Sequence, residues 1–144
     1  MSQERKAKLR RLMGEIYDEG NPAAMADLYA PDIVRHAPAP LPDLAGIAAY
    51  KQYLAPSEYV YSDLRLAIDD IICEDDTCTM RYTLQMTHTG YNPVFDLQAT
   101  GKRATVNASV TSRWVDGRIV EEWIVADLLG FLQQLGAMPD PGQS

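Results

Sequence analysis

Residues 105–126 read TVNASVTSRWVDGRIVEEWIVA, and this stretch decides the fold class. In its first half apolar side chains alternate with polar ones, which is the period-two pattern of a strand with one buried face. The pair Asp116-Gly117 that follows is a strong signal for a two-residue hairpin turn. We therefore expect a second strand to return antiparallel from Ile119 to Ala126.

The order of elements along the chain places helices before most of the strands. Apolar side chains at helical spacing predict a first helix from about Gln3 to Asp18. Asn21 and Pro22 are typical of the cap and first position of a second, short helix. We expect the remaining elements to be a short strand at 33–36, a helix at about 44–54, strands at about 64–72 and 80–88, a connection at 90–101 and a last helix at 128–135. This order predicts an α+β fold with an antiparallel sheet.

The size and charge of the chain restrict the classes of function. At 144 residues it has the length of one domain, and we expect a single domain over residues 1–138 with a frayed tail at 139–144. The net charge of −7 argues against a nucleic-acid partner and against an anionic membrane surface. No apolar run reaches the roughly 18 residues of a membrane span, and the N-terminus lacks the apolar segment of a secretory signal. We therefore expect a cytoplasmic protein.

The two cysteines, Cys73 and Cys78, flank an acidic turn. Across a hairpin they could face each other, so a disulfide is geometrically conceivable. In a cytoplasmic protein two small buried thiols are the favoured interpretation.

Four stretches carry a resemblance to a known family: residues 33–36 (IVRH), 87–90 (THTG), 116–123 (DGRIVEEW) and 127–136 (DLLGFLQQLG). With them the chain resembles the SnoaL-like polyketide cyclases, within the nuclear transport factor 2-like (cystatin-like) cone folds. The resemblance implies a curved antiparallel or mixed sheet wrapped around N-terminal helices to form a cone with a pocket, usually in a homodimer. It also implies a small apolar or aromatic molecule as ligand. In the founding cyclases the reaction is an intramolecular aldol closure, without metal or cofactor, and we expect none here.

Asp127 and His88 are the candidate catalytic residues. An aldol closure needs a base that removes a proton next to a carbonyl, and a carboxylate in an apolar pocket suits this task. Asp127 matches the acidic residue of the cyclases, and we expect it on the same face as Trp123, at the pocket rim. It also immediately precedes a helix, where Asp is a favoured N-cap, so base and cap both stay open. His88 matches the pocket histidine of the cyclases; the alternative is a buried histidine that pins the loop starting at Gly90.

Four further residues are candidates for substrate binding: His36, Trp123, Tyr82 and Tyr53. His36 ends a short strand and is expected at the rim or in a loop-pinning role, whereas the three aromatic residues either line the pocket or belong to the core. The polar positions of strand 105–113 either form a pocket wall for an oxygenated ligand or lie on the outer face of the sheet, solvated or packed against a second subunit; we favour the outer face.

Three functions remain open at this stage. The first is cofactor-free acid/base catalysis on a bulky apolar carbonyl compound, by aldol-type cyclisation or isomerisation. The second is epoxide hydrolysis, which would require Arg113 inside the cavity between two carboxylates. The third is a non-catalytic module that binds a small ligand, because one fold can serve unrelated functions.

Overall fold

The computed structural model describes residues 2–55 and 57–138, with the backbone alone for residues 57 and 58. The tail at 139–144, which we expected to fray, lies outside the described residues. None of the described helices is long and apolar enough to cross a membrane.

A six-stranded mixed sheet forms the body of the molecule, with the strand order β2-β1-β6-β5-β4-β3. Its strands are β1 (Tyr29–His36), β2 (Leu44–Ala45), β3 (Tyr61–Glu74), β4 (Thr77–His88), β5 (Arg103–Val115) and β6 (Arg118–Ala126). Strands β3 to β6 are consecutive antiparallel neighbours, whereas β1 pairs with β6 in parallel. The predicted fold class, α+β with a curved mixed sheet, is confirmed.

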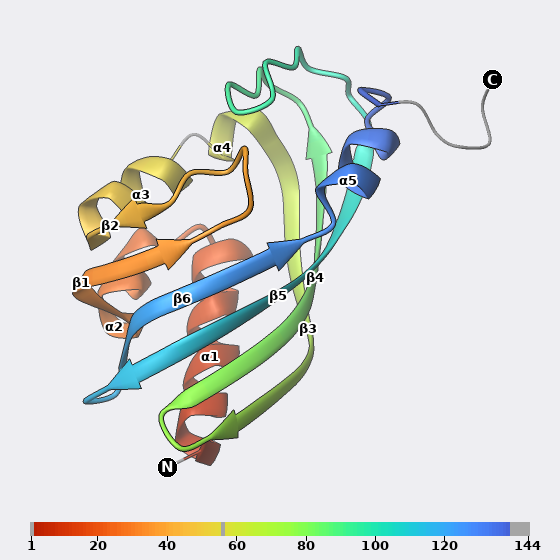
Figure 1. Cartoon of the computed structure of the whole chain (residues 1–144). Coiled ribbons are helices and arrows are strands. Elements are labelled where there is room, and N and C mark those ends of the chain that lie inside the picture. The colour runs from red at the N-terminus through yellow and green to blue at the C-terminus, as the bar shows by residue number, and fades with distance from the viewer. Residues whose placement is uncertain (1, 56, 139–144) are drawn as a thin grey trace.

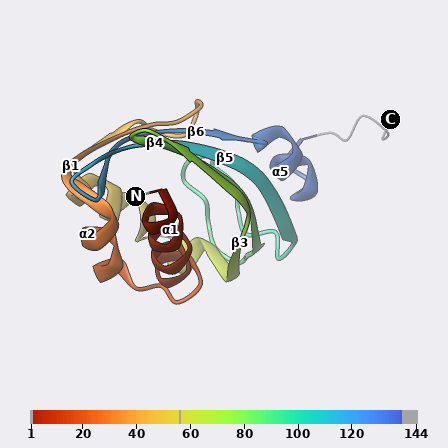
Figure 2. The same ribbon diagram turned by 90° about the horizontal axis from the view of Figure 1, so that it is seen from below.

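The helices close the concave side of this sheet. Helix α1 (Ser2–Tyr17) runs beneath the curved strands, and α2 (Met25–Leu28) and α3 (Ile47–Leu54) cover the side next to β1 (Figures 1 and 2). The short helix α4 (Ser57–Val60) leads into β3, and α5 (Leu128–Gln134) follows β6 at the opposite end of that strand from the 116–117 turn (Figure 1). The larger core cluster lies between the helices and the concave face of the sheet.

Local sequence signals account for most element boundaries. The Asn21 side chain accepts a hydrogen bond from the Ala23 amide and caps a short 3₁₀ turn (Pro22–Ala24) ahead of α2, as expected. The expected helix at 44–54 is shorter, because residues 44 and 45 pair with β1 and the backbone turns at Gly46, whose φ is 91°. Strand β1 begins at Tyr29 instead of Ile33, with an irregular register between Tyr29 and Val34.

The faces of the central strands follow the predicted alternation. On β4, Met80, Met86 and His88 are buried while the intervening residues are more exposed. On β5, Ala108, Val110, Ser112 and Trp114 are buried, and the odd-numbered polar positions lie on the outer face, as expected. The inner face of the sheet is thus mainly apolar along these two strands, with His88 and Ser112 as buried polar residues.

The interpretation of Cys73 and Cys78 as free thiols is wrong. They are directly paired across the β3–β4 hairpin and form a disulfide with an S–S distance of 2.10 Å. The pairing brings their Cα atoms to 4.1 Å, so the hairpin register itself puts the sulfur atoms within bonding reach. Disulfides persist mainly in oxidising compartments, and the cytoplasmic location therefore stays a prediction.

Candidate active site in the cone

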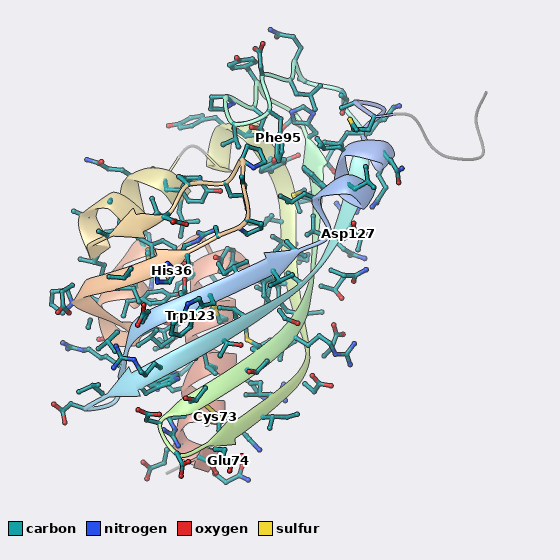
Figure 3. The ribbon with its side chains drawn as sticks, viewed as in Figure 1. His36, Cys73, Glu74, Phe95, Trp123 and Asp127 are labelled. Atoms are coloured by element: carbon teal, nitrogen blue, oxygen red, sulfur yellow. A yellow bond between two sulfur atoms is a disulfide. The ribbon has the colours of Figure 1, made fainter. Side chains whose placement is uncertain are left out.

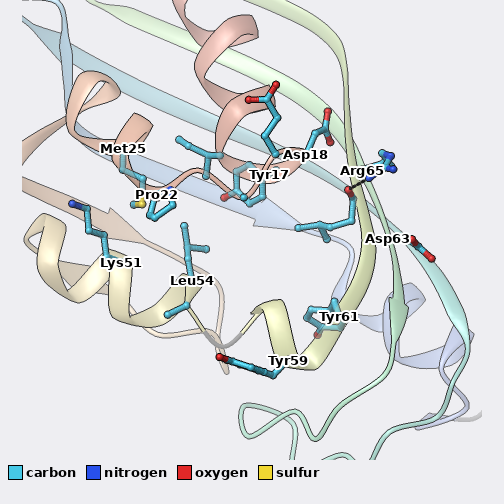
Figure 4. Close-up of a pocket in the computed structure, with 15 residues that line it drawn as sticks. Tyr17, Asp18, Pro22, Met25, Lys51, Leu54, Tyr59, Tyr61, Asp63 and Arg65 are labelled. Atoms are coloured by element: carbon cyan, nitrogen blue, oxygen red, sulfur yellow. Dashed lines mark hydrogen bonds between the residues drawn. The ribbon is translucent and has the colours of Figure 1, made fainter.

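A cavity of about 510 Å³ opens between the C-terminal end of α1, helix α3 and the first residues of β3 (Figure 4). This volume falls in the range of small-molecule sites. Its walls are mostly apolar and aromatic, with charged side chains near the rim. Lining residues include Tyr17, Met25, Leu54, Tyr61 and Leu64, and the charged groups Asp18, Glu19, Lys51, Asp63 and Arg65.

Deeper in the cone, a second and much smaller cavity of about 10 Å³ lies beside the carboxyl group of Glu122. That is about the space that one water molecule needs. Its walls come from α1, α3 and the inner face of the sheet: Met13, Tyr17, Tyr29, Tyr50, Leu66, Met80, Tyr82, Val110 and Ile124. Tyr17 lines both cavities, so its side chain stands between the outer space and Glu122.

Glu122 is held by a hydrogen bond inside this aromatic box. The hydroxyl of Tyr50 donates to Glu122 Oε1 at 2.6 Å, and both residues are only 1% exposed. The hydroxyls of Tyr50 and Tyr29 are 3.4 Å apart, and their rings pack with centroids at 4.9 Å. A fully buried carboxyl group with one strong donor is thereby fixed at the inner end of the cone.

Burial sets the protonation of these groups. Desolvation raises the pKa of Glu122, although the Tyr50 hydrogen bond and the charge of Arg35 act in the opposite direction. Desolvation also raises the pKa of Tyr17 to about 12, so its phenol keeps its proton and remains a hydrogen-bond donor at neutral pH. The site therefore combines a carboxyl group whose pKa is raised by burial with a neutral phenol that lines both cavities.

A β-bulge explains why Glu122, and not Glu121, points inward. Trp114 pairs with Ile119 while the preceding Arg113 pairs with Glu121, so β6 carries one extra residue, Val120. An extra residue moves every following side chain to the other face of the sheet. The expectation that the face carrying Trp123 lies at the pocket rim is therefore wrong.

Asp127 lies at the end of β6 and caps α5 (Figure 3). Its Oδ1 accepts a hydrogen bond from the Gly130 amide at 2.9 Å, and the residue is exposed. It lines neither of the two cavities. The cap that the sequence left open is confirmed, and the catalytic role of Asp127 stays a prediction.

His88 is fully buried and is the last residue of β4. Its Nδ1 accepts a hydrogen bond from the Thr100 amide at 3.2 Å and lies 3.1 Å from the Thr100 hydroxyl, while its Nε2 has no partner among the described residues. Its ring lies 5.9 Å from that of Tyr61, which lines the larger cavity. His88 thus fastens the 90–101 connection, and its catalytic role also stays a prediction.

His36 and Trp123 lie on the outer face of the sheet, not in the cavities (Figure 3). The two rings stack at 5.5 Å, and His36 Nε2 is 2.7 Å from Glu121 Oε2. Arg113 donates to the other oxygen of Glu121 at 3.3 Å, so it lies on the outer face. Because Trp123 follows the bulge, it points away from the pocket, contrary to the expected facing.

The two remaining candidates lie inside the cone. Tyr82 lines the inner cavity, and the ring of Tyr53 lies under the guanidinium of Arg35, with Cζ 4.9 Å from the ring centroid. Sequence reasoning missed Glu122 and Arg35 as site residues. The available signal for Glu122 was its position next to Glu121 in one strand. Because neighbouring side chains of a strand point to opposite faces, one of the two carboxylates must point to the buried face of the sheet.

The comparisons with known proteins agree with this architecture. The family model for the SnoaL-like polyketide cyclases matches residues 7–135. The chain belongs to the SnoaL-like polyketide cyclase family. No curated protein matches the sequence.

Several solved structures share the fold at low sequence identity. AclR, a candidate hydroxylase from Streptomyces galilaeus, is 26% identical with a TM-score of 0.83, over 97% of this chain and 89% of that one. A candidate polyketide cyclase from Acidithiobacillus ferrooxidans is 24% identical with a TM-score of 0.80, over 94% and 96%. A protein with a ketosteroid isomerase-like fold from Catenulispora acidiphila, in complex with trimethylamine, is 15% identical with a TM-score of 0.75, over 90% and 93%. The two at 24% and 15% identity establish the fold alone.

Proposed function

We propose that this SnoaL-like protein performs cofactor-free acid/base catalysis on a bulky, mostly apolar carbonyl compound, with Glu122 as the group that moves the proton. The observation that carries the proposal is the buried Glu122 carboxyl, bonded to the Tyr50 hydroxyl at 2.6 Å at the inner end of an aromatic cavity. A carboxyl group whose pKa is raised by burial is suited to general acid/base work near neutral pH.

In this proposal Glu122 takes a proton from the carbon next to a carbonyl. The electron pair of the C–H bond moves to the carbonyl oxygen and gives an enolate. A general base acts directly or through one water, and the inner cavity has about the volume of one water. In the same proposal Tyr17, which lines both cavities and whose hydroxyl contacts that of Tyr50, donates a hydrogen bond to the developing oxyanion.

The enolate can then follow one of two courses. In aldol-type cyclisation its carbon attacks a second carbonyl of the same molecule, a C–C bond forms, and the new alkoxide takes up the proton from Glu122. In isomerisation the proton returns to a different carbon and the double bond moves. Both courses conserve the atoms of the substrate and need no cofactor.

The experiment below also distinguishes this proposal from two alternative functions. Epoxide hydrolysis receives less support, because Arg113 pairs with Glu121 on the outer face. A module that only binds a small ligand would use the same cavity without transferring a proton.

The test measures deuterium exchange in D₂O at the carbon next to the carbonyl of a bulky cyclic monoketone, followed by NMR. We expect the wild-type protein to accelerate exchange and Glu122→Gln to lose that acceleration by a factor of about 100 or more. Asp127→Asn and His88→Gln, measured alongside, test the sequence-based assignment. Loss in Asp127→Asn with full activity in Glu122→Gln would move the catalytic role to Asp127, and binding without exchange in any form would favour the binding module.

We also propose that the protein is a homodimer that packs through the outer face of the sheet. Trp123 and Val125 are 41% and 70% exposed on that face of β6, and exposed apolar side chains on one sheet face favour an interface. Light scattering of the wild type should give twice the chain mass, and Val125→Asp should give the single-chain mass. A wild-type monomer at high concentration would overturn this.

A further inference from the structure

Arg35 is a buried cation without a carboxylate partner. It is 5% exposed, and its Nε has no hydrogen-bond partner. The ion pairs among the described residues join His36 with Glu121, Arg81 with Asp70 and Arg113 with Glu121, and none of them includes Arg35. A buried charge without a counter-charge in contact is costly, so its position requires an explanation.

The strand register places Arg35 beside Glu122. The two residues are partners in the parallel ladder of β1 and β6, where neighbouring strands lie about 4.8 Å apart. Both side chains point into the cone, and each is at least 95% buried, since their exposed fractions are 5% and 1%. No ion pair joins them, so the cation acts on the carboxyl group at short range without a direct bond.

Tyr50 connects the two groups. The guanidinium carbon of Arg35 lies 5.2 Å from the centroid of the Tyr50 ring, within the range of a cation–π contact. The hydroxyl of the same ring donates to Glu122 at 2.6 Å. The Tyr50 side chain thus contacts the Arg35 guanidinium through the face of its ring and the Glu122 carboxyl group through its hydroxyl.

The other ionisable groups around Glu122 are phenols. They come from α1, β1, α3 and β4: Tyr17, Tyr29, Tyr50 and Tyr82. Burial raises the pKa of each of these phenols, so all of them are neutral at physiological pH. Among the described groups that influence Glu122, Arg35 is the one that carries a charge. Without Arg35, the Tyr50 hydrogen bond would be left as the one influence that offsets the desolvation of the ionised Glu122.

We propose that Arg35 is a positioning residue: its buried guanidinium, lying beside Glu122 and over the ring of Tyr50, stabilises the carboxylate form that accepts the proton. This inference rests on the proposed function, in which Glu122 is the base. It assigns to Arg35 a role that needs no contact with the substrate.

The test follows the ¹³C chemical shift of the Glu122 carboxyl group against pH in the full chain, with the signal assigned from its loss in Glu122→Gln. We expect Arg35→Met to move the titration midpoint upward by about one pH unit or more, the size typical of losing a nearby opposite charge. Arg35→Lys, which keeps the charge, should stay closer to the wild type than to Arg35→Met. Arg113→Met, which removes a cation from the outer face, is the matched control and should leave the midpoint unchanged.

An unchanged midpoint in Arg35→Met would overturn the proposal. If that variant does not fold, Arg35→Gln supplies the same comparison with a polar side chain of similar length. The titration does not depend on turnover, so the two proposals can fail separately. An upward shift in a protein without exchange activity would support the role of Arg35 and reject catalysis. Exchange activity that needs Glu122, with no shift in Arg35→Met, would reject the role of Arg35 alone.

Discussion

The hydrogen bond from Tyr50 to Glu122 gives a stability prediction that requires no knowledge of the substrate. Tyr50→Phe removes one hydroxyl group and keeps the ring, so the packing against Tyr29 and Arg35 should persist. What is lost is a 2.6 Å hydrogen bond between two residues that are each 1% exposed. The variant also removes the contacts of that hydroxyl with the hydroxyls of Tyr29 and Tyr17, so the part of the loss that changes with pH is the part that reports on Glu122.

The expected loss depends on pH, and its sign follows from the pKa of Glu122. Burial raises the pKa of Glu122 in the folded state. At a pH just above the ordinary glutamate pKa, the folded protein therefore binds more protons than the unfolded chain. The free energy of unfolding consequently falls as the pH rises through this window. The Tyr50 hydrogen bond lowers the pKa of Glu122, so its removal extends the fall to higher pH. We expect a loss of about 1 kcal/mol at pH 4, where the carboxyl group is neutral, and about 1.5–3 kcal/mol at pH 8.

Urea unfolding at the two pH values measures these losses, and thermal melts should show a shift of about 2–4 °C per kcal/mol. Tyr29→Phe is the matched control, because the Tyr29 hydroxyl lies 3.4 Å from that of Tyr50 and makes no hydrogen bond to Glu122. Its effect should be smaller and should not grow with pH. A Tyr50→Phe loss that is equal at both pH values would refute the assignment of a titrating carboxyl group at this position.

Three further predictions concern features outside the cavity. The double variant Cys73→Ala/Cys78→Ala should lose about 2 kcal/mol in urea unfolding, because the disulfide closes only a short loop; an unchanged midpoint would show that the bond does not stabilise the fold. Asp127→Ala should cost about 1 kcal/mol through the lost cap of α5, whereas Asp127→Asn should cost much less, and equal losses would contradict the cap. Gly90→Ala should cost about 3 kcal/mol or prevent folding, since a Cβ there would lie 1.9 Å from a backbone carbonyl oxygen; Gly14→Ala, in open space, is the control.

The sequence correctly predicted the features that depend on a single local signal. The alternation of β4 and β5 identified their buried faces, and Asp116-Gly117 identified the turn between β5 and β6, where both residues have positive φ. Asn21 identified a cap. Each of these follows from local chemistry within a few residues, so tertiary context had little to change.

The chemistry of the cone could not be predicted in the same way. The inward position of Glu122 depends on a single extra residue at Val120, and nothing in the alternation of β6 marks that bulge. The partners of Glu122 are equally distant in sequence: Arg35 comes from β1 and Tyr50 from α3. Only the parallel pairing of β1 with β6, which hairpin signals do not indicate, brings these groups together.

A crystal structure with a bound naphthol tests the location of the site most directly. A naphthol is flat and apolar, and its phenolic oxygen resembles that of an enolate. We expect the ring in the larger cavity, with its oxygen directed toward Tyr17, which separates that cavity from Glu122. A naphthol bound beside Asp127, with the cone unoccupied, would contradict the assignment of catalysis to Glu122.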